Sequence, residues 1–106
     1  MNLVERIKRN IIAELVLSPY TSGISISKPL KEALIILRAI PGITVVTHAM
    51  GTNIMCDNID ILFEAVKKCH NFLIESYPRV VTTIKIDERS DKLNRTMQDK
   101  IDAVTD

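Results

Sequence analysis

The sequence contains few aromatic residues: two phenylalanines, two tyrosines and no tryptophan in a chain of 106 residues. Its apolar content therefore consists mainly of isoleucine, valine and leucine, which is typical of sheets and of helices packed on sheets. Hydrophobic residues make up 46% and charged residues 25% of the chain, a balance that excludes the composition of a disordered protein. At this length we expect one domain with a single core.

An excess of charge of one sign is absent as well. The 14 basic and 13 acidic residues are mixed along the chain, so the charge distribution does not indicate a nucleic-acid-binding surface. No apolar run approaches the ~20 residues needed to cross a bilayer. The N-terminus lacks the small-residue cleavage site of a signal peptide. We therefore predict a cytoplasmic protein that binds neither nucleic acid nor a membrane.

Cysteine is scarce, since the chain has only Cys56 and Cys69. A disulfide scaffold normally has more cysteines in a shorter chain. A zinc site needs ligands at a recognisable spacing, and the adjacent Cys69 and His70 would point about 100° apart on a helix. We predict two free thiols, no metal site and no cofactor.

Glycine is scarce too, with three in the chain. A phosphate-binding loop would offer several glycines leading into a helix, whereas Gly51 stands between two β-prone runs in "THAMGTNIMC". The pattern indicates a hairpin in which Gly51 can take a positive φ. Binding residues often lie on loops held by a rigid scaffold, so Thr47, Met50 and Thr52 are candidates for contact with a small ligand.

The remaining pattern alternates strands and helices. The run "IIAELVLSP" is β-prone and ends at a proline, and Ser27 followed by Pro29 predicts an N-cap and first turn of a helix. A second helix, capped by Asp57 or Asn58, has an apolar stripe that includes Phe63 and His70. The predicted strands cover residues 11–19, 43–49, 52–56 and 79–86, and the predicted helices lie within residues 27–40, 57–76 and about 96–104.

This βαββαβ order predicts an α+β, ferredoxin-like sandwich. It has a four-stranded antiparallel sheet with two helices on one face, followed by a short C-terminal helix. We expect residues 11–106 to form the domain and residues 1–10 to be an N-terminal extension. Both faces of the first strand are largely apolar, so the face without helices is expected to meet another subunit.

Six segments in this order resemble the small thiamine-binding protein family, also described as MTH1187/YkoF-like and UPF0045/DUF77. They are "AELVLSP", "GISISKPL", "HAMGT", "AVKKCH", "RVVTTIKIDERSD" and "QDKIDAV", and they span nearly the whole of residues 11–104. The resemblance implies a ferredoxin-like fold and assembly into a homodimer or homotetramer through the open sheet faces. It also implies non-catalytic binding of thiamine or its hydroxymethylpyrimidine part. One departure is Met55, which stands where an acidic residue is common in the family.

A flat aminopyrimidine needs hydrogen-bonding groups in one plane and apolar surfaces for its ring faces. The candidate ligand-binding residues are Glu14, Ser25, Ser27, Thr47, Met50, Gly51, Thr52 and His70. Two of them have a structural alternative: Glu14 as an interface carboxylate, and His70 as a core histidine with one hydrogen-bonded nitrogen. The alternating charges of "KIDERSD" are interpreted as an ion-pair network around a turn, although Arg79 or Arg89 could also contact a phosphate.

Two other functions are open at this level. An enzyme is disfavoured, because no nucleophile and base can be argued to converge and "SGISISKP" lacks the arginine that ferredoxin-like acyl phosphatases place there. A regulatory or structural oligomer that binds another metabolite is the main alternative, since this fold carries many functions.

Overall fold

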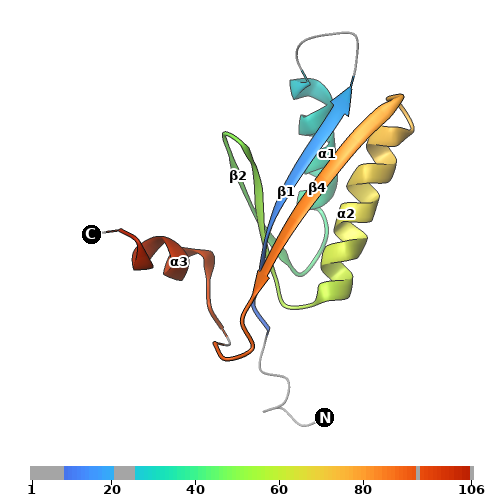
Figure 1. Cartoon of the computed structure of the whole chain (residues 1–106). Coiled ribbons are helices and arrows are strands. Elements are labelled where there is room, and N and C mark those ends of the chain that lie inside the picture. The colour runs from blue at the N-terminus through green and yellow to red at the C-terminus, as the bar shows by residue number, and fades with distance from the viewer. Residues whose placement is uncertain (1–8, 21–25, 93, 106) are drawn as a thin grey trace.

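The computed structural model describes residues 9–20, 26–92 and 94–105 (Figure 1). The predicted loop that contains Ser25 lies outside the described residues. The elements are β1 (Ile11–Tyr20), α1 (Ser27–Arg38), β2 (Ile43–His48), β3 (Gly51–Cys56), α2 (Ile59–Ile74), β4 (Arg79–Glu88) and α3 (Met97–Ala103). No helix in the described part of the chain is long and apolar enough to cross a membrane.

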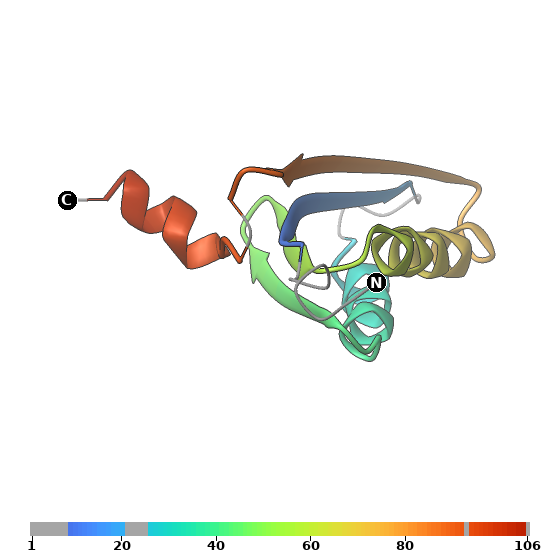
Figure 2. The ribbon, with the colours of Figure 1, turned by 90° about the horizontal axis from the view of Figure 1, so that it is seen from below.

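The four strands form one antiparallel sheet in the order β2-β3-β1-β4. Helices α1 and α2 cover one face of this sheet, whereas α3 projects away from the other face (Figure 2). The predicted ferredoxin-like βαββαβ fold is therefore confirmed, including the short C-terminal helix. We call the face without α1 and α2 the open face.

Alternation along the central strand divides the core from the open face. Ile11, Ala13, Leu15 and Leu17 of β1 are at most 6% exposed and belong to the core under the helices. The side chains between them face the other way, and the strand register then gives the composition of the open face. It consists of Ile12, Glu14, Val16, Ser18, Tyr20, Thr44, Val46, His48, Asn53, Met55, Arg79, Val81, Thr83, Lys85 and Asp87.

The buried stripe of α2 is rotated from the predicted one and shares Leu62 and Leu73 with it. Phe63 was expected in the core, but it is 51% exposed, while the buried stripe passes through Ala65 and Cys69. The reason is the close approach of the two helices, since the thiol of Cys69 lies 3.5 Å from the carbonyl oxygen of Ala33 on α1. Small side chains permit this contact, and the phenyl ring would not fit there.

Two local predictions were also wrong. Ile26, not Ser27, is the N-cap of α1, and Ser27 is its first helical residue. Pro29 still falls in the first turn, where its missing N–H needs no partner in the helix. At the hairpin, Gly51 begins β3 and does not have a positive φ. A glycine is favoured there for space, because an added Cβ would lie 3.3 Å from the carbonyl oxygen of Leu15.

Both cysteines are buried free thiols, and burial raises the pKa of the Cys69 thiol to about 11. At pH 8 only about one thiol in a thousand would then be the reactive thiolate. We expect no measurable reaction of Cys69 with a thiol-specific chromogenic reagent while the protein is folded, and full reaction in guanidinium. A Cys56→Ser variant isolates the signal of Cys69, and rapid reaction of that folded variant would contradict this packing.

Candidate functional site

A cavity of about 290 Å³ lies where the β2–β3 hairpin meets β1 and the start of α1. We call it the hairpin pocket. Its walls come from the second half of β1, of which both faces contribute, and from α1 with its N-cap, and its rim comes from the hairpin. The lining residues are Leu15, Val16, Leu17, Ser18, Ile26, Leu30, Leu34, Thr47, His48, Ala49, Met50, Gly51 and Thr52.

Thr52 is the one buried polar residue among the core side chains of the described residues, at 5% exposure. It pairs with Leu15 of β1 and with Thr47 of β2 in the strand register, so the sheet fixes its position. Its hydroxyl forms no side-chain hydrogen bond with the rest of the chain that the structure describes. Arg95 Nε is the one fully buried side-chain polar atom without a partner among the described residues, so the hydroxyl of Thr52 is open to the pocket, where it can bond to water or to a ligand.

The rim of the hairpin pocket is held by two side chains. Arg38 at the end of α1 donates from Nη2 to the hydroxyl of Thr47 at 2.9 Å, which ties the helix to β2. His48 accepts the backbone N–H of Met50 at Nδ1, at 3.3 Å, which holds the turn. Because Nδ1 accepts, we assign the proton of the neutral ring to Nε2.

That Nε2 of His48 lies 3.4 Å from Oε2 of Glu14. The histidine therefore contacts the open face through Glu14, while it also lines the hairpin pocket. Glu14 itself does not line this pocket. It is connected to the pocket through its contact with the imidazole ring of His48.

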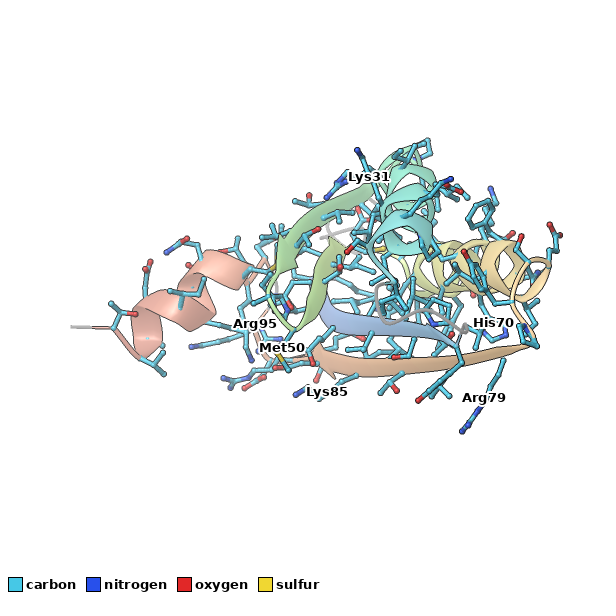
Figure 3. The ribbon with its side chains drawn as sticks, turned by 90° about the horizontal axis from the view of Figure 1, so that it is seen from above. Lys31, Met50, His70, Arg79, Lys85 and Arg95 are labelled. Atoms are coloured by element: carbon cyan, nitrogen blue, oxygen red, sulfur yellow. The ribbon has the colours of Figure 1, made fainter. Side chains whose placement is uncertain are left out.

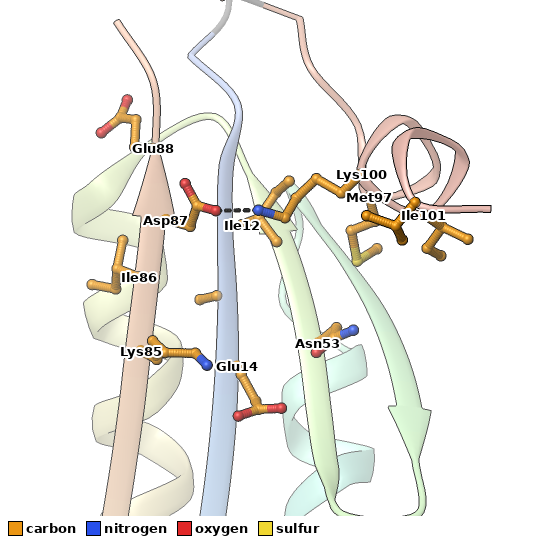
Figure 4. A pocket seen from close by; sticks show the side chains of 12 residues that line it. Ile12, Glu14, Asn53, Lys85, Ile86, Asp87, Glu88, Met97, Lys100 and Ile101 are labelled. Atoms are coloured by element: carbon orange, nitrogen blue, oxygen red, sulfur yellow. Dashed lines mark hydrogen bonds and ion pairs between the residues drawn. The ribbon is translucent and has the colours of Figure 1, made fainter.

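A second, larger cavity of about 700 Å³ lies between the open face and α3 (Figure 4). We call it the open-face groove. Ile12, Glu14, Asn53, Lys85 and Asp87 form its floor on the sheet. Met97, Lys100, Ile101 and Val104 form the side contributed by the C-terminal segment.

Charge pairs at Asp87 fasten α3 beside this groove. Asp87 binds Nη2 of Arg95 at 3.0 Å and also pairs with Nζ of Lys100, whose side chain crosses the sheet in front of Ile12 (Figure 4). These two cations, Lys100 first, lower the pKa of the Asp87 carboxyl. Thr96 and Asp99 complete a capping box at the start of α3.

The structure thus separates the predicted site residues. Thr47, Met50, Gly51 and Thr52 come together in the hairpin pocket, and Ser27 lies beside its wall residue Ile26. Glu14 lines the open-face groove instead. His70 lies between α2 and β4 (Figure 3), with Nδ1 2.7 Å from the hydroxyl of Thr82, and lines neither cavity. This placement matches the structural alternative for His70, and Ser25 is outside the described residues.

Sequence reasoning missed the apolar walls and the bridging histidine. Leu30 and Leu34 lie on the apolar stripe of the first helix, and periodicity alone does not show that such a stripe also borders a cavity. From the sequence His48 could equally point to solvent, although its position beside a tight turn is a usable signal. No cluster of three or more metal-binding side chains occurs among the described residues.

The predicted charge network around the end of β4 is present. Besides the pairs of Asp87, Arg9 makes a bidentate contact with Glu88 at 2.6 and 2.7 Å, which lowers the pKa of that carboxyl. Arg89 pairs with Asp91 across the following turn. These contacts fix the chain on both sides of the sheet end, and none of these charges borders the hairpin pocket.

Two solved proteins that share only a low sequence identity with this chain have the same fold. The DUF77 domain of unknown function from Bacillus cereus is 19% identical, with a TM-score of 0.77 and coverage of 93% of both chains. A Thermotoga maritima protein that is provisionally assigned to thiamine biosynthesis or salvage is 14% identical, with a TM-score of 0.75 and coverage of 91% of this chain and 99% of that one.

Closer relatives cover nearly the whole chain. UPF0045 protein MJ1052 of Methanocaldococcus jannaschii is 35% identical over 96 residues, which are 91% of this chain and 93% of the relative. Its crystal structure superposes with a TM-score of 0.82. A UPF0045 protein of Methanothermobacter thermautotrophicus is 34% identical over 96 residues, 89% of this chain and 95% of the relative. A sequence model of the family described as "Thiamine-binding protein" matches residues 13–105, and this chain therefore belongs to the thiamine-binding protein family.

Proposed function

We propose that this protein binds thiamine or its hydroxymethylpyrimidine part in the hairpin pocket without transforming it. The hydroxyl of Thr52, which has no hydrogen-bond partner among the described residues and lines a mainly apolar pocket, is the observation that carries the proposal. A hydroxyl can donate one hydrogen bond and accept others, so it suits both the amino group and the ring nitrogen of an aminopyrimidine. Family membership supports a ligand of this class.

The size of the hairpin pocket supports a small, flat ligand. Its volume of about 290 Å³ lies near the lower end of the ~300–1,000 Å³ typical of small-molecule sites. Leu30 and Leu34 of α1 and Leu17 of β1 all line this space, so apolar surface from two elements is available to a ring. The more polar part of the ligand would extend past Met50, which is 81% exposed at the rim.

The lining also supports binding rather than catalysis. Among the described residues that line the hairpin pocket, His48 is the sole ionisable group, and its Nδ1 is occupied by the backbone of the turn. Acid–base or nucleophilic catalysis needs two groups in reach of each other and of the substrate. A carrier or sensor role fits this lining better.

The proposal includes self-association through the open face, as a homodimer or homotetramer. Val46 and Val81 are 48% and 38% exposed there, on the two edge strands β2 and β4 of the face that α1 and α2 leave open. Apolar side chains gathered on one face of a small domain commonly mark an interface between subunits.

Replacing Thr52 by valine tests the ligand site. Valine keeps the shape of the side chain and removes the hydroxyl, so we expect the Kd for hydroxymethylpyrimidine to rise about 5-fold or more, equivalent to roughly 1 kcal/mol. Isothermal titration calorimetry with thiamine, thiamine phosphate and hydroxymethylpyrimidine measures this effect.

The matched control is Thr44→Val, which makes the same change on the open-face side of the same hairpin. This control is expected to leave the affinity unchanged. The proposal fails if the folded parent protein gives no heat with any of the three ligands, or if both valine variants lose affinity equally.

A further inference from the structure

We propose that the hairpin pocket takes an anionic ligand, a phosphate monoester of hydroxymethylpyrimidine, and that Arg38 binds the phosphate at the rim. This ligand class rests on the proposed function and narrows it to the phosphorylated pyrimidine rather than the thiamine cation. Three observations support it: the unused donors of Arg38, the hydroxyl groups that line the pocket, and the lack of acidic side chains in the described part of the lining.

Helix α1 directs Arg38 to the hairpin pocket. Arg38 follows Leu30 and Leu34 at intervals of four residues, so the three side chains share one side of the helix. Leu30 and Leu34 line the cavity. Long side chains of a helix lean toward its N-terminus, which is the end where Ile26 borders the pocket. The guanidinium accordingly reaches the lining residue Thr47, with Nη2 2.9 Å from its hydroxyl.

The guanidinium of Arg38 has donors that its contacts in the chain leave unused. A guanidinium carries five N–H groups, and within the described residues the side chain of Arg38 donates only to the hydroxyl of Thr47. Arg38 forms no ion pair with those residues either. Guanidinium groups bind phosphate through two parallel N–H···O bonds, so the remaining donors suit a phosphate that lies beside Thr47.

Hydroxyl groups continue this donor surface into the pocket. Ser18, Thr47 and Thr52 all line the cavity. The hydroxyl oxygen of Thr47 accepts from Arg38, so its own hydrogen is available to a ligand. Thr47 is exposed at the rim, whereas Thr52 is 5% exposed inside. A ligand with its phosphate at Thr47 would therefore have its ring near Thr52.

The described part of the lining offers no side chain that stabilises a cationic ring. None of the described lining residues is acidic, and none is phenylalanine, tyrosine or tryptophan. The carboxylate of Glu14 contacts His48 from the open face and does not line the pocket. The thiazolium ring of thiamine carries a positive charge, which a carboxylate or an aromatic face would stabilise and which Arg38 would repel. The pocket therefore suits the pyrimidine and its phosphate better than thiamine.

The two arginines that the sequence suggested as phosphate contacts lie elsewhere. Arg79 is on the open face, with its guanidinium 4.6 Å from the centroid of the Tyr20 ring, and Arg89 pairs with Asp91. Neither arginine lines the hairpin pocket. Arg79 is exposed and, like Arg38, forms no ion pair with the described residues, which makes it a matched control.

Calorimetric titration of the parent protein with three ligands tests the preference. At low ionic strength we expect hydroxymethylpyrimidine phosphate to bind at least 10-fold more tightly than hydroxymethylpyrimidine, and thiamine to bind more weakly than either. Added salt is expected to reduce the gain from the phosphate, because Arg38 is exposed. Equal affinities for the pyrimidine and its phosphate, or tighter binding of thiamine, would overturn the proposal.

Arg38→Gln tests the contact itself. This variant is expected to raise the Kd of the phosphate ester at least 10-fold and to leave the Kd of hydroxymethylpyrimidine unchanged. Arg38→Lys keeps the charge and is expected to retain part of the gain, whereas Arg79→Gln is expected to bind both ligands as the parent does. If Arg38 only holds Thr47 in place, Arg38→Gln weakens both ligands equally, and that result would refute the phosphate contact.

The two proposals fail separately. Binding of hydroxymethylpyrimidine with no gain from the phosphate would refute the role of Arg38 and leave the proposed function intact. A protein that binds glycerol phosphate as tightly as hydroxymethylpyrimidine phosphate, and gives no heat with hydroxymethylpyrimidine, would refute the pyrimidine ligand and retain the phosphate contact. A folded parent protein that binds none of these compounds would refute both.

Discussion

Replacing Leu62 by alanine is expected to lower the free energy of unfolding by about 3 kcal/mol. Leu62 is 0% exposed in the core formed by α2 and the sheet, so its truncation removes buried apolar surface and leaves a cavity. For a domain of this size the loss corresponds to a decrease in Tm of more than about 10 °C. Urea unfolding followed by circular dichroism measures it.

The neighbouring Phe63 supplies the matched control. It is larger than leucine, but it is 51% exposed, so Phe63→Ala is expected to change the stability by much less than Leu62→Ala. A comparable loss for Phe63→Ala in a monomeric preparation would show that Phe63 is buried in the core, as expected from the sequence, and would contradict its exposure in the structure.

The second large effect concerns the hairpin pocket. Leu30→Trp places an indole ring where α1 lines the cavity, and we expect the affinity for hydroxymethylpyrimidine to fall at least 100-fold. The physical reason is occupancy, since a cavity of about 290 Å³ has no room for both an extra aromatic side chain and a ring ligand. Calorimetric titration at high protein concentration measures the loss.

Lys31→Trp is the control for this change. Lys31 is the next residue on α1, is exposed, and points away from the sheet (Figure 3). The same bulky residue is expected to leave binding unaffected there. Retained affinity in Leu30→Trp, with its fold verified by circular dichroism, would place the ligand outside the hairpin pocket and leave the open-face groove as the site to examine.

The fold was predictable because the relevant signals are local. Alternating apolar residues in β1, a proline in the first turn of α1 and the Asn58 cap of α2 each act within a few residues, and the order of elements then leaves few topologies. The side-chain oxygen of Asn58 accepts hydrogen bonds from the backbone N–H groups of Asp60 and Ile61, as the sequence suggested. The stripe of α2 was less predictable, because it depends on how closely Ala33 and Cys69 bring the two helices together.

The candidate site was only partly predictable, since it depends on strand register. Alternation along β1 already predicts that Glu14 points to the other face of the sheet from Ala13 and Leu15. Only the pairing of Leu15 with Thr52 shows which hairpin residues share the core face. Glu14 and Thr52 therefore belong to different cavities, although both seemed suitable for one ligand. The orientation of α3 depends on its ion pairs with Asp87, which lies ten residues before the start of the helix. A local sequence pattern cannot predict such a contact.

Strand β2 is an edge of the sheet, and it pairs on one side only, with β3. The outer wall of the hairpin pocket is therefore attached to the rest of the domain through one ladder, the packing of Ile43 and Val45 against the core, and the Arg38 to Thr47 hydrogen bond. An outward swing of this edge would widen the entrance without disturbing the central strands. The residence time of the proposed ligand would then depend on the opening of a single edge strand rather than on unfolding of the domain.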